Sequence, residues 1–327
     1  MEESEKRKVL ISGIKPTGDL HIGNYLGAMQ QFLEFQEKFE SVIFIADYHA
    51  LATAYDPARL KENIYRVAAG YLAIGLNPSK VTLFKQSDVR EHTELAWVFN
   101  SITTMPYLMR AHAFKDAEAR NKEISVGTFD YPMLMAADIL MYDADVVPVG
   151  QDQKQHIEFA RDTAEKFNRM YGETFKLPEA YIKDDVATVP GIDGQKMSKS
   201  YRNTIPLFAS DEEIKKQVFA IVTDSKGESE QKDPESDNIF ALHKFFSKKE
   251  LSDLEKRYKE GGIGYKESKE ILYENIRAFV TPIRKQYDTL LGDRSFIESV
   301  LEEGAAKVRP KAEAKMQEVR RKIGVTL

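Results

Sequence analysis

The sequence predicts an α/β fold, a doubly wound parallel sheet with helices on both faces, followed by an all-helical C-terminal part. Between Val9 and Tyr171, short apolar runs of strand length alternate with segments of helical period. The runs are continuously apolar, as in strands that are buried on both faces. After about Phe208 the chain is rich in Lys and Glu, keeps a helical period and has no strand pattern.

Each element of the predicted sheet region follows from its own local pattern. The expected strands are 9–12, 42–46, 81–84 and 146–149. The expected helices are 24–39, 57–75, 91–101, 130–142 and 152–171. Pro57 marks a helix start, Gly75 marks a helix end, and Pro132 is expected in the first turn of its helix.

The length and the change in composition predict a division of the chain. We expect a sheet domain at 1–208, which includes a glycine-flanked, mobile loop at 191–202, and a helical domain at 209–293. Residues 224–237 are polar and are expected to form an exposed loop. Residues 294–327 are expected to form a locally basic helix that packs back toward the sheet domain.

The composition excludes several classes of protein. The 327 residues include no cysteine, so disulfides, thiolate metal sites and a thiol nucleophile are excluded. No apolar run approaches the roughly 18–20 residues of a membrane span, and Met1–Lys8 lacks the apolar core of a signal peptide. We therefore expect a cytoplasmic protein. The net charge of −5 argues weakly against a nucleic-acid partner, although a local basic face can bind RNA.

Unusual residues collect where the predicted strands end, at 13–24, 47–49 and 150–153, which is where ligands bind in such sheets. In the block 13–24, glycines allow a backbone to approach a nucleotide, and a helix N-terminus follows. The alternative is an ordinary strand–turn–helix. The spacing matches neither the phosphate-binding P-loop nor the dinucleotide fingerprint.

A second block, 196–200, reads Lys-Met-Ser-Lys-Ser after Gly191-Ile-Asp-Gly194. Two lysines on such a loop can clamp a polyphosphate and stabilise charge on a leaving group. The alternative is a solvated lysine-rich loop, and this block alone is a weak signal.

Together the two blocks resemble the signatures of the class I aminoacyl-tRNA synthetases. Residues 21–24, His-Ile-Gly-Asn, resemble the "HIGH" motif except at the last position, and residues 196–200 are identical to "KMSKS". Residues 131–140 and 146–156 resemble further blocks of the tryptophanyl-tRNA synthetases. The resemblance covers most of 9–203. It implies a Rossmann-like catalytic domain followed by an anticodon-binding domain.

The resemblance also assigns residues to ATP. They are Gly13, Lys15, Pro16, Thr17, Gly23, Asn24, Gly150, Gln151, Asp152, Val189, Lys196, Met197, Ser198, Lys199 and Ser200. Lys196 and Lys199 are expected to act on the leaving pyrophosphate, with Asn24 and Lys15 as the other catalytic candidates. Three further residues, Lys115, Arg120 and Lys122, are open candidates for a phosphate contact.

The block 131–140 predicts a helix face that carries a carboxylate. Tyr131, Met135, Asp138 and Tyr142 are spaced to share that face. A lone Asp among apolar residues needs a partner, and a buried structural ion pair is the ordinary alternative. The resemblance makes Asp138 the acceptor for the indole N–H of tryptophan. It assigns the rest of the pocket to Tyr131, Met135, Gln153, His49, Val147, Val149 and Ile11.

The resemblance implies a reaction in two steps. L-tryptophan attacks the α-phosphate of ATP, giving tryptophanyl-adenylate and pyrophosphate, and the terminal adenosine of tRNA(Trp) then attacks the adenylate. Mg²⁺ is expected to arrive with ATP and not in a protein cage or cluster. Family members are dimers, so a homodimer without membrane contact is expected.

Three other functions stay open at this point. A tyrosyl-tRNA synthetase shares the fold and both ATP motifs. A small nucleotidyltransferase uses a similar His-x-Gly signature. A synthetase-like paralogue could bind RNA without catalysis.

Overall fold

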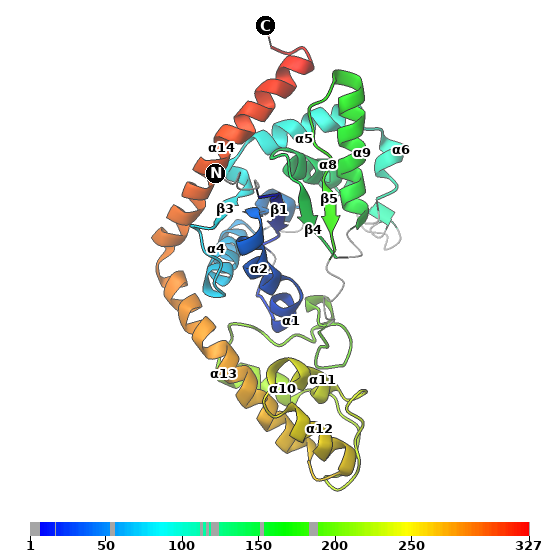
Figure 1. Ribbon diagram of the computed structural model, residues 1–327, viewed down its shortest axis with the longest axis vertical. Helices are drawn as coiled ribbons and strands as arrows, with labels where there is room; N and C mark the ends of the chain where they lie inside the picture. Colours follow the sequence, from blue (N-terminus) through cyan, green and yellow to red (C-terminus); the bar gives the residue numbers. More distant parts are fainter. Residues whose placement is uncertain are drawn as a thin grey trace, which may run out of the picture.

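The computed structural model describes residues 7–16, 18–52, 56–111, 114–115, 118, 124–150, 154–182 and 189–326. Within them, five parallel strands form one sheet in the order β3-β2-β1-β4-β5, with helices on both faces (Figure 1). The strands are β1 Val9–Ile14, β2 Glu40–Ile45, β3 Val81–Lys85, β4 Val146–Pro148 and β5 Glu179–Tyr181. The predicted fold class is confirmed.

The two faces of the sheet carry separate apolar cores, because neighbouring residues of a strand point to opposite sides. Leu10 packs with α2 (Gln30–Lys38) and α4 (Pro57–Ala73). Ile11 packs with α5 (Glu91–Ile102), α8 (Val126–Leu140) and α9 (Lys154–Tyr171). This double burial explains why the strands appear in the sequence as continuous apolar runs.

The sequence misses the edge strand β5. Its three residues, Glu179–Tyr181, are partly exposed and contain no apolar run. They are recruited because β5 pairs with β4, from Val146 opposite Glu179 to Pro148 opposite Tyr181. Tertiary pairing, and not local pattern, makes this segment a strand.

Two helix boundaries differ from the prediction. The helix expected at 24–39 begins with α1 (Ile22–Asn24), continues as a π-helix over Tyr25–Met29 and ends with α2. The helix expected to start at Asp130 starts at Val126, because the Ser125 hydroxyl accepts from the Thr128 amide at 3.2 Å and caps it. Pro132 therefore lies inside α8 and not in its first turn.

Short helices connect the main elements. They are α3 Asp47–Ala50, α6 Met105–Leu108 and the 3₁₀ turns Gln86–Asp88 and Lys199–Tyr201. The turn Gln86–Asp88 directly follows β3, and α3 follows β2 after one residue. Both segments therefore lie at the carboxyl ends of strands, where ligands bind in parallel sheets.

After Phe208, the described part of the chain contains helices and loops but no strand. The helices are α10 Asp211–Phe219, α11 Asn238–Phe246, α12 Leu251–Glu260, α13 Tyr265–Gly292 and α14 Arg294–Lys322. Figure 1 shows α13 and α14 following one another along one long side of the molecule, with α10, α11 and α12 gathered beside α13. The stretch 224–237 is a mostly exposed loop, but Lys232 is buried and donates to the carbonyls of Gly227 and Glu230.

Helix α14 returns to the sheet and lies along its edge strand β3. Its Gly304 is so close that a Cβ atom there would stand 1.9 Å from the carbonyl oxygen of Leu83 in β3. Val300 and Leu301 join one apolar core and Ala305 and Val308 join the other. Helix α14 therefore connects the two cores and covers an edge that would otherwise be open.

We predict that Gly304→Ala destabilises the protein by about 2 kcal/mol, because the added methyl group must push α14 away from β3. The measurement is the free energy of unfolding in urea. Gly292→Ala is the matched control, since a Cβ at this helical glycine meets nothing within 4 Å. Equal stability of the two variants would contradict the close packing.

Candidate functional site

Two cavities open near the carboxyl ends of the strands. The inner cavity, about 710 Å³, is lined by the ends of β1 and β4, by α2 and by α8. The outer cavity, about 1070 Å³, is lined by residues 16–21, by α4, by residues 199–209 and by α10 and α13. Both cavities lie beside the block 13–24, here called the nucleotide loop. The outer cavity also includes part of residues 191–202, here called the lysine loop.

The inner cavity brings together the predicted pocket residues. Seven of the eight line it: Ile11, His49, Tyr131, Met135, Asp138, Val147 and Val149. The eighth, Gln153, lies outside the described residues. Gly13, Lys15 and Gly150, which are predicted ATP residues, line the same cavity. The inner cavity is thus lined by residues predicted for the tryptophan pocket and by residues predicted for ATP.

Asp138 is the central polar group of the inner cavity. It is 1 % exposed and has three side-chain partners from three different segments. Its Oδ1 lies 2.7 Å from Gln86 Nε2 and 2.6 Å from His92 Nδ1, and its Oδ2 lies 2.8 Å from His49 Nε2. Burial acts to raise the pKa of Asp138, but the hydrogen bonds from His49 and His92 outweigh it and hold this pKa below its ordinary value. Asp138 is therefore an ionised acceptor.

The walls around Asp138 are aromatic and apolar. The Tyr131 hydroxyl lies 3.2 Å from the ring nitrogens of His156, and burial raises the pKa of Tyr131 to about 12. Phe44 lies under the end of β1, where a Cβ on Gly13 would stand 2.6 Å from its ring. Gly13 is thus required by packing against Phe44. The cavity suits a flat apolar ligand that carries one hydrogen-bond donor.

The predicted "HIGH"-like residues form a reciprocal cap at the start of α1. The Asn24 amide N–H donates to His21 Nδ1 at 3.2 Å, and the His21 amide N–H donates to Asn24 Oδ1 at 3.1 Å. Burial, and then the nearby charge of Lys199, lowers the pKa of His21 to about 4. His21 is neutral at pH 7, so its Nδ1 can accept. The side-chain oxygen of Asn24 is engaged in this cap, and its NH₂ group is the part suited to donate to a nucleotide.

The nucleotide loop and the lysine loop touch each other. The Gly23 amide donates to Met197 Sδ at 3.3 Å, and a Cβ on Gly23 would stand 3.2 Å from the Met197 Cβ. The Met197 amide donates to the Val189 carbonyl at 2.9 Å, so this carbonyl is engaged within the loop. Met197 is buried, whereas Lys196, Lys199 and Ser200 are exposed.

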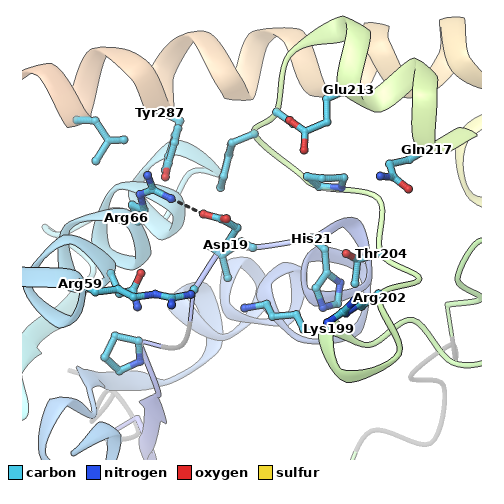
Figure 2. A pocket seen from close by; sticks show the side chains of 18 of the residues that line it. Asp19, His21, Arg59, Arg66, Lys199, Arg202, Thr204, Glu213, Gln217 and Tyr287 are labelled. Carbon is cyan, nitrogen blue, oxygen red and sulfur yellow. Dashed lines mark hydrogen bonds and ion pairs between the residues drawn. The ribbon is translucent and has the colours of Figure 1, made fainter. Parts of the chain in front are cut away.

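Basic side chains from two segments, α4 and residues 199–202, surround the outer cavity. Figure 2 shows Arg59 and Arg66 on one side and Lys199 and Arg202 on the other, with Asp19 between them. Arg66 Nη1 lies 2.5 Å from Asp19 Oδ1. Lys199 and Lys15 are exposed, but the surrounding protein partly removes water from them, and this partial desolvation lowers the pKa of each lysine. The charge of Asp19 opposes the effect at Lys199. These cations could bind an anionic group beside the nucleotide loop.

The other predicted ATP residues are placed as follows. Pro16 lines the outer cavity, and Ser198 accepts from the Ser200 amide at 3.3 Å. Lys115 is exposed and belongs to the lining of neither cavity. The predictions for Thr17, Gln151, Asp152, Arg120 and Lys122 lie outside the described residues.

Among the described residues, no group of three or more His, Cys, Asp or Glu side chains could hold a metal ion. No helix in the described part of the chain is long and apolar enough to cross a membrane.

Comparison with known proteins decides the family. The family described as tRNA synthetases class I (W and Y) matches residues 3–281. The chain belongs to this family. The tryptophan–tRNA ligase of Campylobacter jejuni is 46 % identical over 317 residues, which are 97 % of this chain and 99 % of the relative. That of Fusobacterium nucleatum is 46 % identical over 318 residues, 96 % of this chain and 97 % of the relative.

A solved structure agrees closely with this synthetase. The C. jejuni tryptophanyl-tRNA synthetase complexed with ADP and tryptophan has a TM-score of 0.93 and 46 % identity. The match covers 97 % of this chain and 99 % of that one.

The sequence does not predict that Gln86 and His92 belong to the site. Gln86 directly follows β3, a position where ligand-binding residues are expected. His92 shares the apolar face of α5 with Leu95 and Phe99. A histidine on an apolar helix face can indicate a functional site, but it is more often a buried structural residue. The position of His92 in the sequence therefore does not by itself predict its role.

The sequence also does not predict a role for Asn203, although its side chain makes hydrogen bonds that fix the lysine loop of the synthetase. It is 1 % exposed, and its Oδ1 accepts from the Ser198 amide at 2.7 Å. Its Nδ2 donates to Asp193 Oδ1 at 2.7 Å and to the Lys196 carbonyl at 3.1 Å. A Cβ on Gly191 would stand 2.3 Å from Asn203 Nδ2, so this glycine makes room for it.

We predict that Asn203→Ala loosens the lysine loop. Losing these buried bonds costs about 1–3 kcal/mol, which raises the open fraction of the loop about fivefold or more. Trypsin cleavage after Lys196 and Lys199, followed by mass spectrometry, measures this opening. Asn275→Ala is the control, because Asn275 bonds to Ser247 Oγ (2.9 Å) away from the loop. Equal cleavage rates in the two variants would contradict the role of Asn203.

Proposed function

We propose that this synthetase is a tryptophan–tRNA ligase. It activates L-tryptophan with ATP, giving tryptophanyl-adenylate and pyrophosphate, and then transfers tryptophan to the 3′ end of tRNA(Trp). The observation that carries the proposal is an ionised, buried Asp138 at the wall of an apolar cavity beside the nucleotide loop. The relatives that are 46 % identical are tryptophan–tRNA ligases, and the C. jejuni structure holds ADP and tryptophan.

Asp138 selects the amino acid. The indole N–H of tryptophan donates to its carboxylate, while Ile11, Met135, Val147 and Val149 contact the rings. An amino acid without this donor leaves a buried charge poorly paired, which costs far more than a lost apolar contact. Tyr131, His49 and Gln153 complete the proposed pocket.

The nucleotide loop and the lysine loop hold ATP. Gly13, Lys15, Pro16, Thr17, Gly23 and Asn24 act from the first loop, and Val189 with residues 196–200 acts from the second. Gly150, Gln151 and Asp152 follow β4 and contact the ribose side of ATP. The contact between Gly23 and Met197 supports this assignment because it places the two loops at one point.

The chemistry relies on position and charge. The tryptophan carboxylate attacks the α-phosphate, and Lys196 and Lys199 neutralise the charge that grows on the leaving pyrophosphate. Mg²⁺ arrives bound to the ATP phosphates, which is how this ion usually enters nucleotide sites. No covalent enzyme intermediate is needed, which agrees with a chain that lacks cysteine.

The rest of the molecule serves the tRNA. Residues 209–293 form the anticodon-binding domain, the sheet domain spans 1–208, and residues 294–327 tie the two together. The enzyme works as a homodimer in the cytoplasm. The helical composition of the C-terminal part supports the division into domains, and the absence of cysteine agrees with a reducing compartment.

Pyrophosphate exchange into ATP tests the function across all twenty amino acids. We expect exchange with tryptophan and at least about 10⁴-fold lower kcat/KM with tyrosine, because tyrosine offers no donor at the position of the indole N–H. Preferred exchange with tyrosine would support the alternative of a tyrosyl enzyme. No exchange with any amino acid would support a non-catalytic RNA-binding paralogue.

Lys199→Ala tests the leaving-group role. We expect the rate of adenylate formation to fall about 100-fold, with a change in ATP affinity of less than about threefold, because the charge that Lys199 meets appears in the transition state. Single-turnover kinetics separate the two effects. Lys61→Ala, an exposed lysine on α4, is the control. Loss of ATP affinity alone would overturn the role.

A further inference from the structure

The partners of Asp138 are divided unequally between its two carboxylate oxygens. Oδ1 receives two donors, Gln86 Nε2 at 2.7 Å and His92 Nδ1 at 2.6 Å. A carboxylate oxygen accepts about two hydrogen bonds, so Oδ1 is filled by the protein. Among the described residues, Oδ2 receives one donor, His49 Nε2 at 2.8 Å. Asp138 lines the inner cavity, so the remaining acceptor position on Oδ2 is the one left for a ligand.

Hydrogen bonds hold His92 at both of its ring nitrogens. Its side chain is fully buried, and its second nitrogen, Nε2, lies 2.8 Å from the Tyr142 hydroxyl. An ionised carboxylate can only accept, so Nδ1 carries the proton that points to Asp138. Burial and the neighbouring carboxylates raise the pKa of Tyr142, so the phenol beside Nε2 keeps its proton. His92 is therefore bonded at both ring nitrogens, to Asp138 on one side and to Tyr142 on the other.

The ring of His92 is also fixed in orientation. The centroids of Phe44 and Phe84 lie 5.9 Å and 6.1 Å from the His92 centroid. Phe44 belongs to β2 and Phe84 to β3, so the sheet itself supports the ring. Tyr142 follows α8, the helix that carries Asp138. The hydrogen-bonded series Tyr142–His92–Asp138 thus begins and ends at α8, and the strands β2 and β3 support the His92 ring in its middle.

We propose that His92, oriented by Tyr142, is a positioning residue for substrate choice: together with Gln86 it fills Oδ1 of Asp138 and leaves Oδ2 as the single acceptor for the indole N–H. The proposal rests on the proposed function. Without the His92 bond, the Asp138 side chain can turn about its last torsion and present either oxygen. The pocket then keeps its apolar shape but distinguishes poorly between ligands with and without an N–H donor.

The test compares tryptophan with β-(benzothiophen-3-yl)alanine, in which sulfur replaces the indole N–H. The discrimination ratio is kcat/KM for tryptophan divided by that for the analogue, measured by pyrophosphate exchange. The variants are His92→Leu, which removes the donor, and His92→Asn, whose amide nitrogen can stand in for Nδ1. Tyr142→Phe removes only the hydroxyl that orients the ring.

The controls separate the proposal from the function and from general destabilisation. The unmodified enzyme comes first, because its failure to exchange with tryptophan would reject the function itself. His243→Asn is the matched control, since His243 is also fully buried with both nitrogens bonded, to Ser247 and Ser268, but lies in α11. Exchange needs no tRNA, so a loss of stability in α11 should leave the ratio unchanged.

We expect the discrimination ratio to fall at least about tenfold in His92→Leu and about threefold to tenfold in Tyr142→Phe. The loss should appear as a raised KM for tryptophan, with kcat and the KM for ATP within about threefold of the unmodified enzyme. His92→Asn should recover most of the ratio. An unchanged ratio in His92→Leu, or an equal loss in His92→Asn and His92→Leu, would overturn the proposal. If His92→Leu does not fold, the other two variants provide the test. A lowered ratio in Tyr142→Phe with a nearly normal ratio in His92→Asn would support the proposal, and an unchanged ratio in Tyr142→Phe would overturn it.

Discussion

A charged group buried beside an apolar cavity is the constraint that organises this molecule. Asp138 is 1 % exposed, and a carboxylate in such a place is stable only when donors surround it. The donors come from α3, from the turn after β3 and from α5, so three segments distant in sequence must meet at one side chain. The parallel sheet brings these segments together because the carboxyl ends of its strands lie at the same edge.

The two loops at the nucleotide side follow a different principle. They are held by short contacts that involve backbone groups, such as the Gly23 amide on Met197 Sδ and the Ser198 amide on Asn203 Oδ1. Glycines at 23 and 191 leave the space for these contacts. Lys196, Lys199 and Ser200 stay exposed on this frame. A fixed backbone with exposed charged side chains suits a reaction that needs a leaving group to be bound and then released.

The sequence predicted the fold class from local patterns, and it predicted most of the pocket through its resemblance to the class I synthetases. Four strands were visible as apolar runs, and the face of Tyr131, Met135 and Asp138 followed from helical spacing. What it missed depends on partners far along the chain. The strand β5 exists because β4 pairs with it, and His92 reaches Asp138 across 46 positions. The partners of Asn203 are nearer in sequence, but its three bonds depend on the folded path of the lysine loop, which no local sequence pattern indicates.

The close contact between Gly304 and Leu83 has a consequence for how the protein is made. The two residues are separated by more than two hundred positions, so β3 leaves the ribosome long before the helix that covers its edge. During that interval the growing chain carries an open strand edge, which is a surface for pairing with other chains. Completing α14 therefore ends the period in which the nascent sheet is open to aggregation.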